Sequence, residues 1–136
     1  PLLLVAGGTG FAPIKSMLRT ELETAPAGAA ARPIHLFWGA RRAVDLYEDA
    51  LVRDWVAAHP RLLYTAVLSE AVATEAAHQR LGWVHEVVLA EYAQLAQCDA
   101  WIAGPPALID AARAAFAAAG LPEERLRFDS FDYAPR

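Results

Sequence analysis

Apolar residues along the chain alternate between short continuous runs and stripes that recur every three or four positions. The first run, residues 2–6, is uninterrupted, which is typical of a strand buried on both faces of a parallel sheet. Comparable short runs recur along the chain, most of them next to glycine, proline or charged residues. They predict five strands, over residues 2–6, 33–38, 61–68, 99–103 and 125–131.

The stripes between these runs have the spacing of amphipathic helices. Ile14, Met17 and Leu18 share one face of a helix over residues 11–23. Gly120 is expected to end the last helix, because glycine readily takes the conformation that follows a helix. The remaining stripes predict helices over residues 48–58, from Val84 to Leu95 and after Pro106, with loops over 24–32 and 70–82.

This regular alternation predicts a single α/β domain over residues 1–136. Right-handed crossovers then give a parallel, doubly wound, Rossmann-like sheet of five strands, in the order 3-2-1-4-5, with helices on both faces. Ligands of such sheets bind beyond the carboxyl ends of the strands, near the point where the strand order reverses. We therefore expect the chemistry in the turns after the first four strands.

Composition excludes several classes of function. The chain is 56% hydrophobic and 21% charged, which is globular, and its formal charge of −4 comes without a lysine or arginine cluster, so nucleic acid is not an expected partner. No apolar stretch approaches the roughly 20 residues of a membrane span, and nothing resembles a signal peptide. The single cysteine, Cys98, excludes an internal disulfide and favours a reducing, cytoplasmic setting. The four histidines lack the spacing of a helical metal site, so no metal is expected.

The glycine-rich stretch after the first strand, GGTGFAPIKS at 7–16, partly matches two phosphate-binding patterns. A P-loop requires glycines where Thr9 and Ile14 stand, so that pattern fails although Lys15 and Ser16 are present. The dinucleotide pattern G-x-G-x-x-G fits Gly8 and Gly10 but meets Pro13 at its third glycine.

A looser interpretation keeps the physics of both patterns. Glycines allow the backbone to approach a pyrophosphate closely, and Pro13 in the first turn of a helix gives up an N–H that would have no partner in the helix. The remaining amides and the helix dipole favour an anion. The alternative is an ordinary turn between strand and helix that binds nothing.

Four spaced motifs carry a resemblance to a known family over essentially the whole chain. They are GGTGFAP at 7–13, FWGARRAVDLY at 37–47, LS with GWVHE within 68–86, and AGPP through FDSF within 103–131. The chain resembles the nicotinamide-nucleotide domain of the ferredoxin–NADP⁺ reductase family, in particular its oxygenase-reductase and flavin-reductase branch. CDP-6-deoxy-glucoseen reductase-like and NAD(P)H-flavin reductase-like members are the most similar.

The resemblance implies a role for the first motif in holding the cofactor. Gly7, Gly8, Thr9, Gly10 and Pro13 would form the pyrophosphate turn, and Thr9, which lies near nicotinamide and flavin in the family, is the catalytic candidate. The Thr9 hydroxyl would also suit the N-cap of the following helix.

The turns after the second and third strands would bind the adenosine half. Arg41 could pair with a pyrophosphate or a 2′-phosphate, or be an ordinary solvated arginine. Asp45 lies where NADH-preferring relatives carry an acid, although it could instead cap the next helix. Ser69 is followed by Glu70 where NADP-selective relatives have arginine, so the resemblance favours NADH over NADPH.

The last two motifs would face the nicotinamide and the flavin. Ala103, Gly104, Pro105 and Pro106 match the family's C-G-P-P turn with alanine in place of cysteine, although a plain strand-to-helix turn explains the prolines too. Phe131 is the candidate aromatic beside the flavin, or it packs in a terminal strand. We assign His85 and Glu86 a surface or packing role.

The resemblance implies the NAD(P)H-binding domain of a flavin-dependent oxidoreductase. It would pass hydride to FAD or FMN and electrons to an iron–sulfur or other acceptor. The expected partners are a flavin-binding β-barrel domain upstream and a ferredoxin-type domain, carrying a [2Fe-2S] cluster, or an oxygenase component. Because the chain opens at Pro1 directly before a strand, we expect it to be part of a longer polypeptide. The alternative is a non-catalytic nucleotide-binding or regulatory module.

Overall fold

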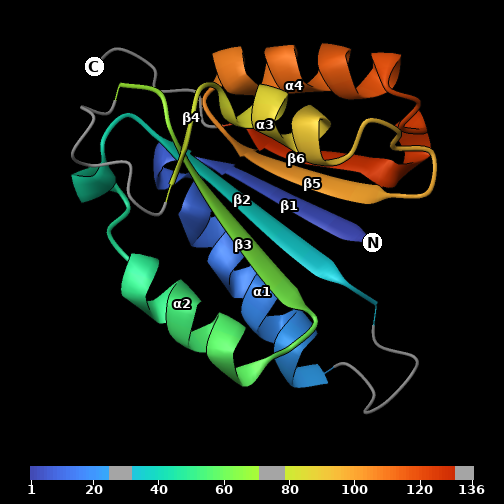
Figure 1. Ribbon diagram of the computed structural model, residues 1–136. Coiled ribbons are helices and arrows are strands. Elements are labelled where there is room, and N and C mark those ends of the chain that lie inside the picture. Colours follow the sequence, from blue (N-terminus) through green and yellow to red (C-terminus); the bar gives the residue numbers. More distant parts are fainter. Residues whose placement is uncertain (25–31, 71–78, 131–136) are drawn as a thin grey trace.

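A parallel sheet between two layers of helices organises the chain (Figure 1). The computed structural model describes residues 1–24, 32–70 and 79–130. The strands are β1 (Leu2–Gly7), β2 (Ile34–Ala40), β3 (Leu62–Leu68), β4 (Arg80–Leu81), β5 (Asp99–Gly104) and β6 (Leu126–Ser130). The helices are α1 (Phe11–Thr24), α2 (Asp49–Ala58), α3 (Val84–Glu91) and α4 (Pro106–Ala118), with 3₁₀ turns η1 (Gly8–Gly10), η2 (Ala43–Asp45) and η4 (Glu123–Arg125).

The strand order is β4-β3-β2-β1-β5-β6, and every pairing is parallel. Apart from β4 this is the predicted order 3-2-1-4-5. The prediction of five strands is corrected by β4, which lies within the loop expected over residues 70–82. Its two residues pair with Val67 and Leu68 of β3. Two exposed residues are too few to produce a periodic pattern, so this edge strand leaves no signal in the sequence.

The two helical layers cover opposite faces of the sheet, with α1 and α2 on one side and α3 and α4 on the other (Figure 1). Successive residues of β1 therefore enter different cores. Leu2 and Leu4 pack with α1 and α2, whereas Leu3 and Val5 pack with α3 and α4, and all four are almost fully buried. Burial on both faces is the reason that β1 appears in the sequence as a continuous apolar run.

A row of small residues crosses the face of the sheet that α1 covers. The row consists of four residues in register on β3, β2, β1 and β5, which are Ala66, Trp38, Ala6 and Ala103. Its one large side chain is therefore the Trp38 indole, with an alanine on each neighbouring strand. The space above the alanines admits the Phe11 ring, which stacks on Trp38 with ring centroids 4.0 Å apart. Both side chains are completely buried.

Helix ends follow the sequence in one case and depart from it in another. Helix α4 ends as predicted, because Gly120 adopts a φ of +95° and the amides of Gly120 and Leu121 bond back to Ala117 and Phe116. Helix α3 is shorter than predicted and ends at Glu91. Leu95 is nevertheless buried, and its N–H donates to the Ala119 carbonyl. Leu95 is therefore apolar because it packs in the core outside the helix, although its spacing in the sequence matches the helical stripe.

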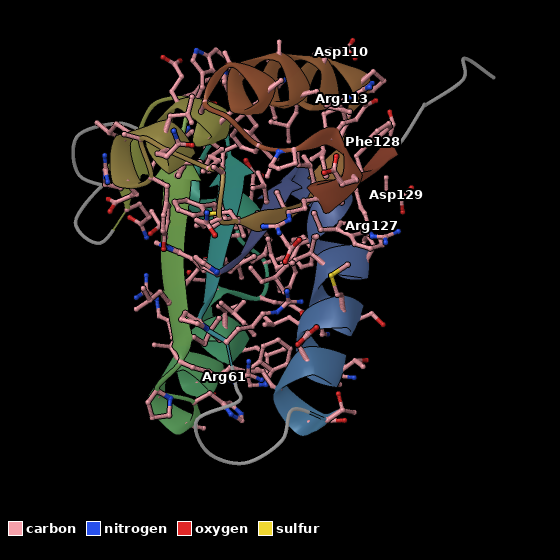
Figure 2. The ribbon with its side chains drawn as sticks, turned by 90° about the vertical axis from the view of Figure 1, so that its right-hand side faces the viewer. Arg61, Asp110, Arg113, Arg127, Phe128 and Asp129 are labelled. Atoms are coloured by element: carbon pink, nitrogen blue, oxygen red, sulfur yellow. The ribbon has the colours of Figure 1, made fainter. Side chains whose placement is uncertain are left out.

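The outer strand β6 is held to α4 by a cation–π contact (Figure 2). The guanidinium of Arg113 lies 4.5 Å from the centroid of the Phe128 ring. Figure 2 also shows Arg127 and Asp129 on this exposed strand, far from Arg61 at the other end of the molecule.

None of the described helices is long and apolar enough to span a membrane.

A buried histidine links α3 to the sheet. His35 on β2 is 6% exposed, and hydrogen bonds join its Nδ1 to the Tyr92 hydroxyl (2.9 Å) and its Nε2 to the Thr65 hydroxyl (2.7 Å). The ring also stacks on Phe37. Burial lowers the pKa of His35 from 6.5 to about 4, against a smaller opposing effect of Glu91.

We expect this histidine to make the protein less stable in mild acid. Because its pKa is lower in the folded state, His35 contributes no penalty above pH 6.5, and stability is lost as the pH falls from 6.5 towards 4. The loss amounts to about 2 kcal/mol between about pH 7.5 and about pH 5. Denaturant unfolding at several pH values gives the slope of the unfolding free energy against pH. This slope should be smaller in His35→Gln and unchanged in the control His59→Gln. Equal slopes in wild type and His35→Gln would contradict the assignment.

Candidate functional site

A cavity of about 830 Å³ opens at the carboxyl edge of the sheet, where the strand order reverses between β1 and β5. Turns after β1, β2, β3 and β5 all line it. Its volume falls in the range of about 300–1,000 Å³ that ligand pockets commonly have. The cavity is therefore large enough, and in the right place, for an extended ligand.

The turn after β1 forms the floor of the cavity at this point of reversal. Gly7, Gly8 and Thr9 line the cavity, whereas Gly10 is buried beneath them. A Cβ added to Gly10 would lie 2.1 Å from the carbonyl oxygen of Ala103, and one added to Gly7 would lie 2.3 Å from Cδ2 of Leu108. Only glycine allows the turn to pack this closely against the end of β5.

Gly8 serves the turn in a different way. Its φ of +56° lies in the left-handed region, and nothing lies within 4 Å of where a Cβ would be. Here glycine is required by the backbone conformation, while the space above it stays open to the cavity. At Gly8 the turn therefore presents backbone to the cavity without a side chain in the way.

The turns after β2 and β3 extend the wall away from β1. Arg41, Ser69 and Glu70 line the cavity, with Arg41 and Glu70 exposed. The N–H of Ser69 donates to the Ala40 carbonyl and that of Glu70 to the Arg41 carbonyl, each at 2.9 Å. These bonds continue the pairing of β2 and β3 past the strands, and they hold the cationic and the anionic side chain at neighbouring positions.

The predicted acid of this wall, Asp45, has a local role. It is not among the cavity-lining residues, and its Oδ2 accepts a hydrogen bond from the Arg42 N–H at 3.2 Å. This bond closes η2, four residues before α2 begins at Asp49, so Asp45 does not cap that helix.

The remaining predicted residues are distributed around the turn after β5. Pro105 lines the cavity, and Pro106 begins α4 as its first residue. Gly104 is buried, and a Cβ there would lie 2.9 Å from Cδ2 of Leu108. Ala103 is completely buried in the core on the α1 side and does not line the cavity. Pro13 lies in the first turn of α1, outside the lining, and Phe131 lies outside the described residues.

The segment that enters α3 contains the motif GWVHE, which sequence analysis noted without assigning any of its residues to the site. Gly82, Trp83, Val84, His85 and Glu86 all line the cavity. The surface or packing role expected for His85 and Glu86 is therefore incomplete, since both border the cavity. Trp83 is 62% exposed in the structure. In the sequence, the signal that could have identified this wall is a tryptophan between Gly82 and the predicted helix.

The approach of α3 to the sheet also depends on a glycine. A Cβ on Gly39, at the end of β2, would lie 2.8 Å from Cβ of Val84. On the opposite side α4 contributes Ala107, Leu108 and Ala111. The cavity is thus lined by glycines, by apolar side chains that include Trp83 and Leu108, and by charged side chains.

Within residues 1–24, 32–70 and 79–130 no three histidine, cysteine, aspartate or glutamate side chains gather as a metal site would require. The largest pKa displacements belong to His35 and to Tyr64, whose pKa is raised by burial and by its hydrogen bond to Asp49. Neither lines the cavity. The cavity's own groups are backbone amides, an exposed indole and side-chain charges.

Residues 4–114 match the family model of the oxidoreductase NAD-binding domain. The match covers most of the chain, which therefore belongs to this family of nicotinamide-nucleotide-binding domains. The resemblance inferred from the four motifs is confirmed.

Individual relatives are considerably longer than the chain. It is 33% identical over 131 residues to a CDP-6-deoxy-L-threo-D-glycero-4-hexulose-3-dehydrase reductase of Yersinia pestis. It is 31% identical over 131 residues to the ferredoxin–NAD(P)⁺ reductase component of a Pseudomonas putida naphthalene 1,2-dioxygenase system. Each alignment covers 96% of the chain and 38% of the relative. Among solved structures, the Amycolatopsis cytochrome P450 reductase GcoB superposes with a TM-score of 0.86 at 28% identity, covering 96% of the chain and 37% of that structure.

The glycine turn permits a direct test of close packing against backbone strain. We expect Gly10→Ala to lower the free energy of unfolding by about 2–3 kcal/mol, because its Cβ would collide with the Ala103 carbonyl. Gly8→Ala should cost about 1 kcal/mol, since it meets a positive φ but no neighbour. Denaturant unfolding of both variants measures the difference. A Gly10→Ala protein as stable as wild type would contradict this packing.

Proposed function

We propose that the chain is the NAD(P)H-binding half of a flavin-dependent oxidoreductase, which passes hydride from the nicotinamide to FAD or FMN and electrons onward to an iron–sulfur or other acceptor. The observation that carries this proposal is the cavity at the point where strand order reverses, with the open backbone of Gly8 at its floor and Thr9 beside it. Membership of the NAD-binding family supports the same ligand.

The residues of the cavity fit a dinucleotide. Gly7, Gly8 and Thr9 offer backbone to a pyrophosphate, and the positive end of the helix that follows favours an anion. Arg41 supplies a cation beside the same cavity. The buried Gly10 and the nearby Pro13 hold the turn in shape rather than contact the ligand.

The adenosine half would lie towards β3 and α3. Trp83 offers an exposed aromatic face on which a planar base can stack, and Ser69 offers a hydroxyl. Glu70 would accept hydrogen bonds from ribose hydroxyls and repel a 2′-phosphate. Asp45, tied to the Arg42 amide, would act from outside the cavity. Together the acidic side chains favour NADH over NADPH.

The nicotinamide end would lie between Thr9 and Pro105. When bound, the reduced nicotinamide supplies a hydride, and the part of this chain is to hold that ring in a fixed orientation. Gly104 allows the β5 turn to approach the β1 turn. Ala103, where relatives carry cysteine, is buried beneath the turn, so it supplies packing and no thiol.

The rest of the reductase would lie outside these residues. The chain spans about two-fifths, 38%, of the length of the two relatives named above. We infer a flavin-binding β-barrel domain upstream, with Phe131 beside the flavin, and a [2Fe-2S] domain or oxygenase component as electron acceptor. A cytoplasmic setting fits the single cysteine and the supply of NADH.

Nucleotide binding and electron transfer test the proposal at two levels. Calorimetry should detect NADH binding by the 136-residue chain. An activity assay of the same chain should show no reductase activity. The protein with its native flanking sequence should oxidise NADH and reduce ferricyanide. Binding by the full protein without any NADH oxidation would favour the non-catalytic nucleotide-binding module instead. Absence of binding to either form would refute a nucleotide function altogether.

Glu70 tests the preference for NADH. We expect Glu70→Arg to raise the affinity for NADPH about tenfold relative to NADH, because a repelling charge is replaced by an attracting one. The matched control is Glu124→Arg, the same change of charge in η4, which precedes β6 and does not line the cavity. Calorimetry with both nucleotides measures the ratio. Tenfold tighter NADPH binding by wild type would overturn the case made from Asp45 and Glu70.

A further inference from the structure

Trp38, to which sequence analysis assigned no role, makes a hydrogen bond to the glycine turn from beneath. Its indole Nε1–H donates to the carbonyl of Gly8 at 3.1 Å. The same carbonyl also accepts the backbone N–H of Phe11, the first residue of α1. The Gly8 carbonyl is therefore directed into the protein by two donors, one of them a completely buried side chain.

The indole itself has little freedom. Phe11 stacks on it at 4.0 Å with an angle of 11° between the rings, and Tyr47 packs edge-on at 5.2 Å. In the sheet it is flanked by Ala6 and Ala66, which leave room for a ring of its size. The donor is thus held in position by packing that does not depend on a ligand.

The direction of the Gly8 carbonyl decides the direction of the next amide. In a trans peptide the C=O of one residue and the N–H of the next point to opposite sides, and all described peptide bonds of the chain are trans. With the Gly8 carbonyl turned towards Trp38, the N–H of Thr9 is turned the other way. We infer that this is the side of the cavity, because Gly8 and Thr9 line the cavity and Trp38 does not.

We propose that Trp38 is a positioning residue for cofactor binding, which orients the Gly8–Thr9 peptide so that its amide faces the pyrophosphate of the nucleotide. This inference rests on the proposed function, because it takes the cavity to be the NADH site. Trp38 itself does not line the cavity and acts only through the turn.

Trp38→Phe keeps an aromatic ring against Phe11 and removes the donor. The matched control is Trp101→Phe, because the buried Nε1 of Trp101 has no hydrogen-bond partner among the described residues. Both variants should be made in the protein with its native flanking sequence. Affinities are measured by calorimetry for NADH, for ADP-ribose, which contains the pyrophosphate, and for AMP, which does not.

We expect Trp38→Phe to bind NADH and ADP-ribose about tenfold more weakly and AMP as wild type does. Trp101→Phe should leave all three affinities unchanged. Equal affinity of Trp38→Phe and wild type for ADP-ribose would overturn the inference, and so would an equal loss for AMP, which indicates general damage. Failure of wild type to bind NADH would refute the proposed function instead.

A second variant covers the case in which Trp38→Phe does not fold. Tyr47→Ala removes one ring that confines the indole, at a side chain that is 53% exposed and outside the cavity lining. Its affinity for ADP-ribose should fall about two- to threefold, with the affinity for AMP unchanged. An unchanged affinity for ADP-ribose in a folded Tyr47→Ala protein would count against the positioning role.

Discussion

The close approach of two backbone turns, one after β1 and one after β5, is the constraint on which the site depends. The carbonyl oxygen of Ala103 occupies the space that a side chain on Gly10 would need, and Leu108 does the same at Gly7 and Gly104. These contacts join the ends of two neighbouring strands whose connections run to opposite sides of the sheet. The crevice at the reversal of strand order is consequently floored by backbone, which under the proposed function would let a pyrophosphate approach amides directly.

Each side of this floor has its own support. On the α1 side, the stacked rings of Phe11 and Trp38 fill the space left by the flanking alanines, and the indole holds the Gly8 carbonyl. On the other side, α3 and α4 line the cavity between them, and the absence of a side chain at Gly39 allows the start of α3 to pack against β2. A rigid aromatic layer below and an open cavity above suit the proposed function, in which the domain orients a nicotinamide cofactor.

Much of the fold could be predicted because the central strands β1 and β2 are buried on both faces. That burial produces the continuous apolar runs, and the alternation with helices then limits the strand order to a parallel doubly wound sheet. The exceptions have physical causes. Strand β4 has two exposed residues and hence no pattern, and Leu95 keeps a helical spacing although α3 has already ended, because it is buried against α4's end.

By itself, the sequence determined the family, the strand order and the glycine turn, because glycine, proline and apolar runs act through local backbone geometry. Only the tertiary structure decided which residues meet in the cavity. Gly10 and Ala103 lie beneath its floor rather than along its wall, and Trp83 reaches the wall from a distant segment. The bond from Trp38 to Gly8 spans 30 residues of sequence. Such contacts depend on how strands and helices pack in three dimensions, which local spacing does not encode.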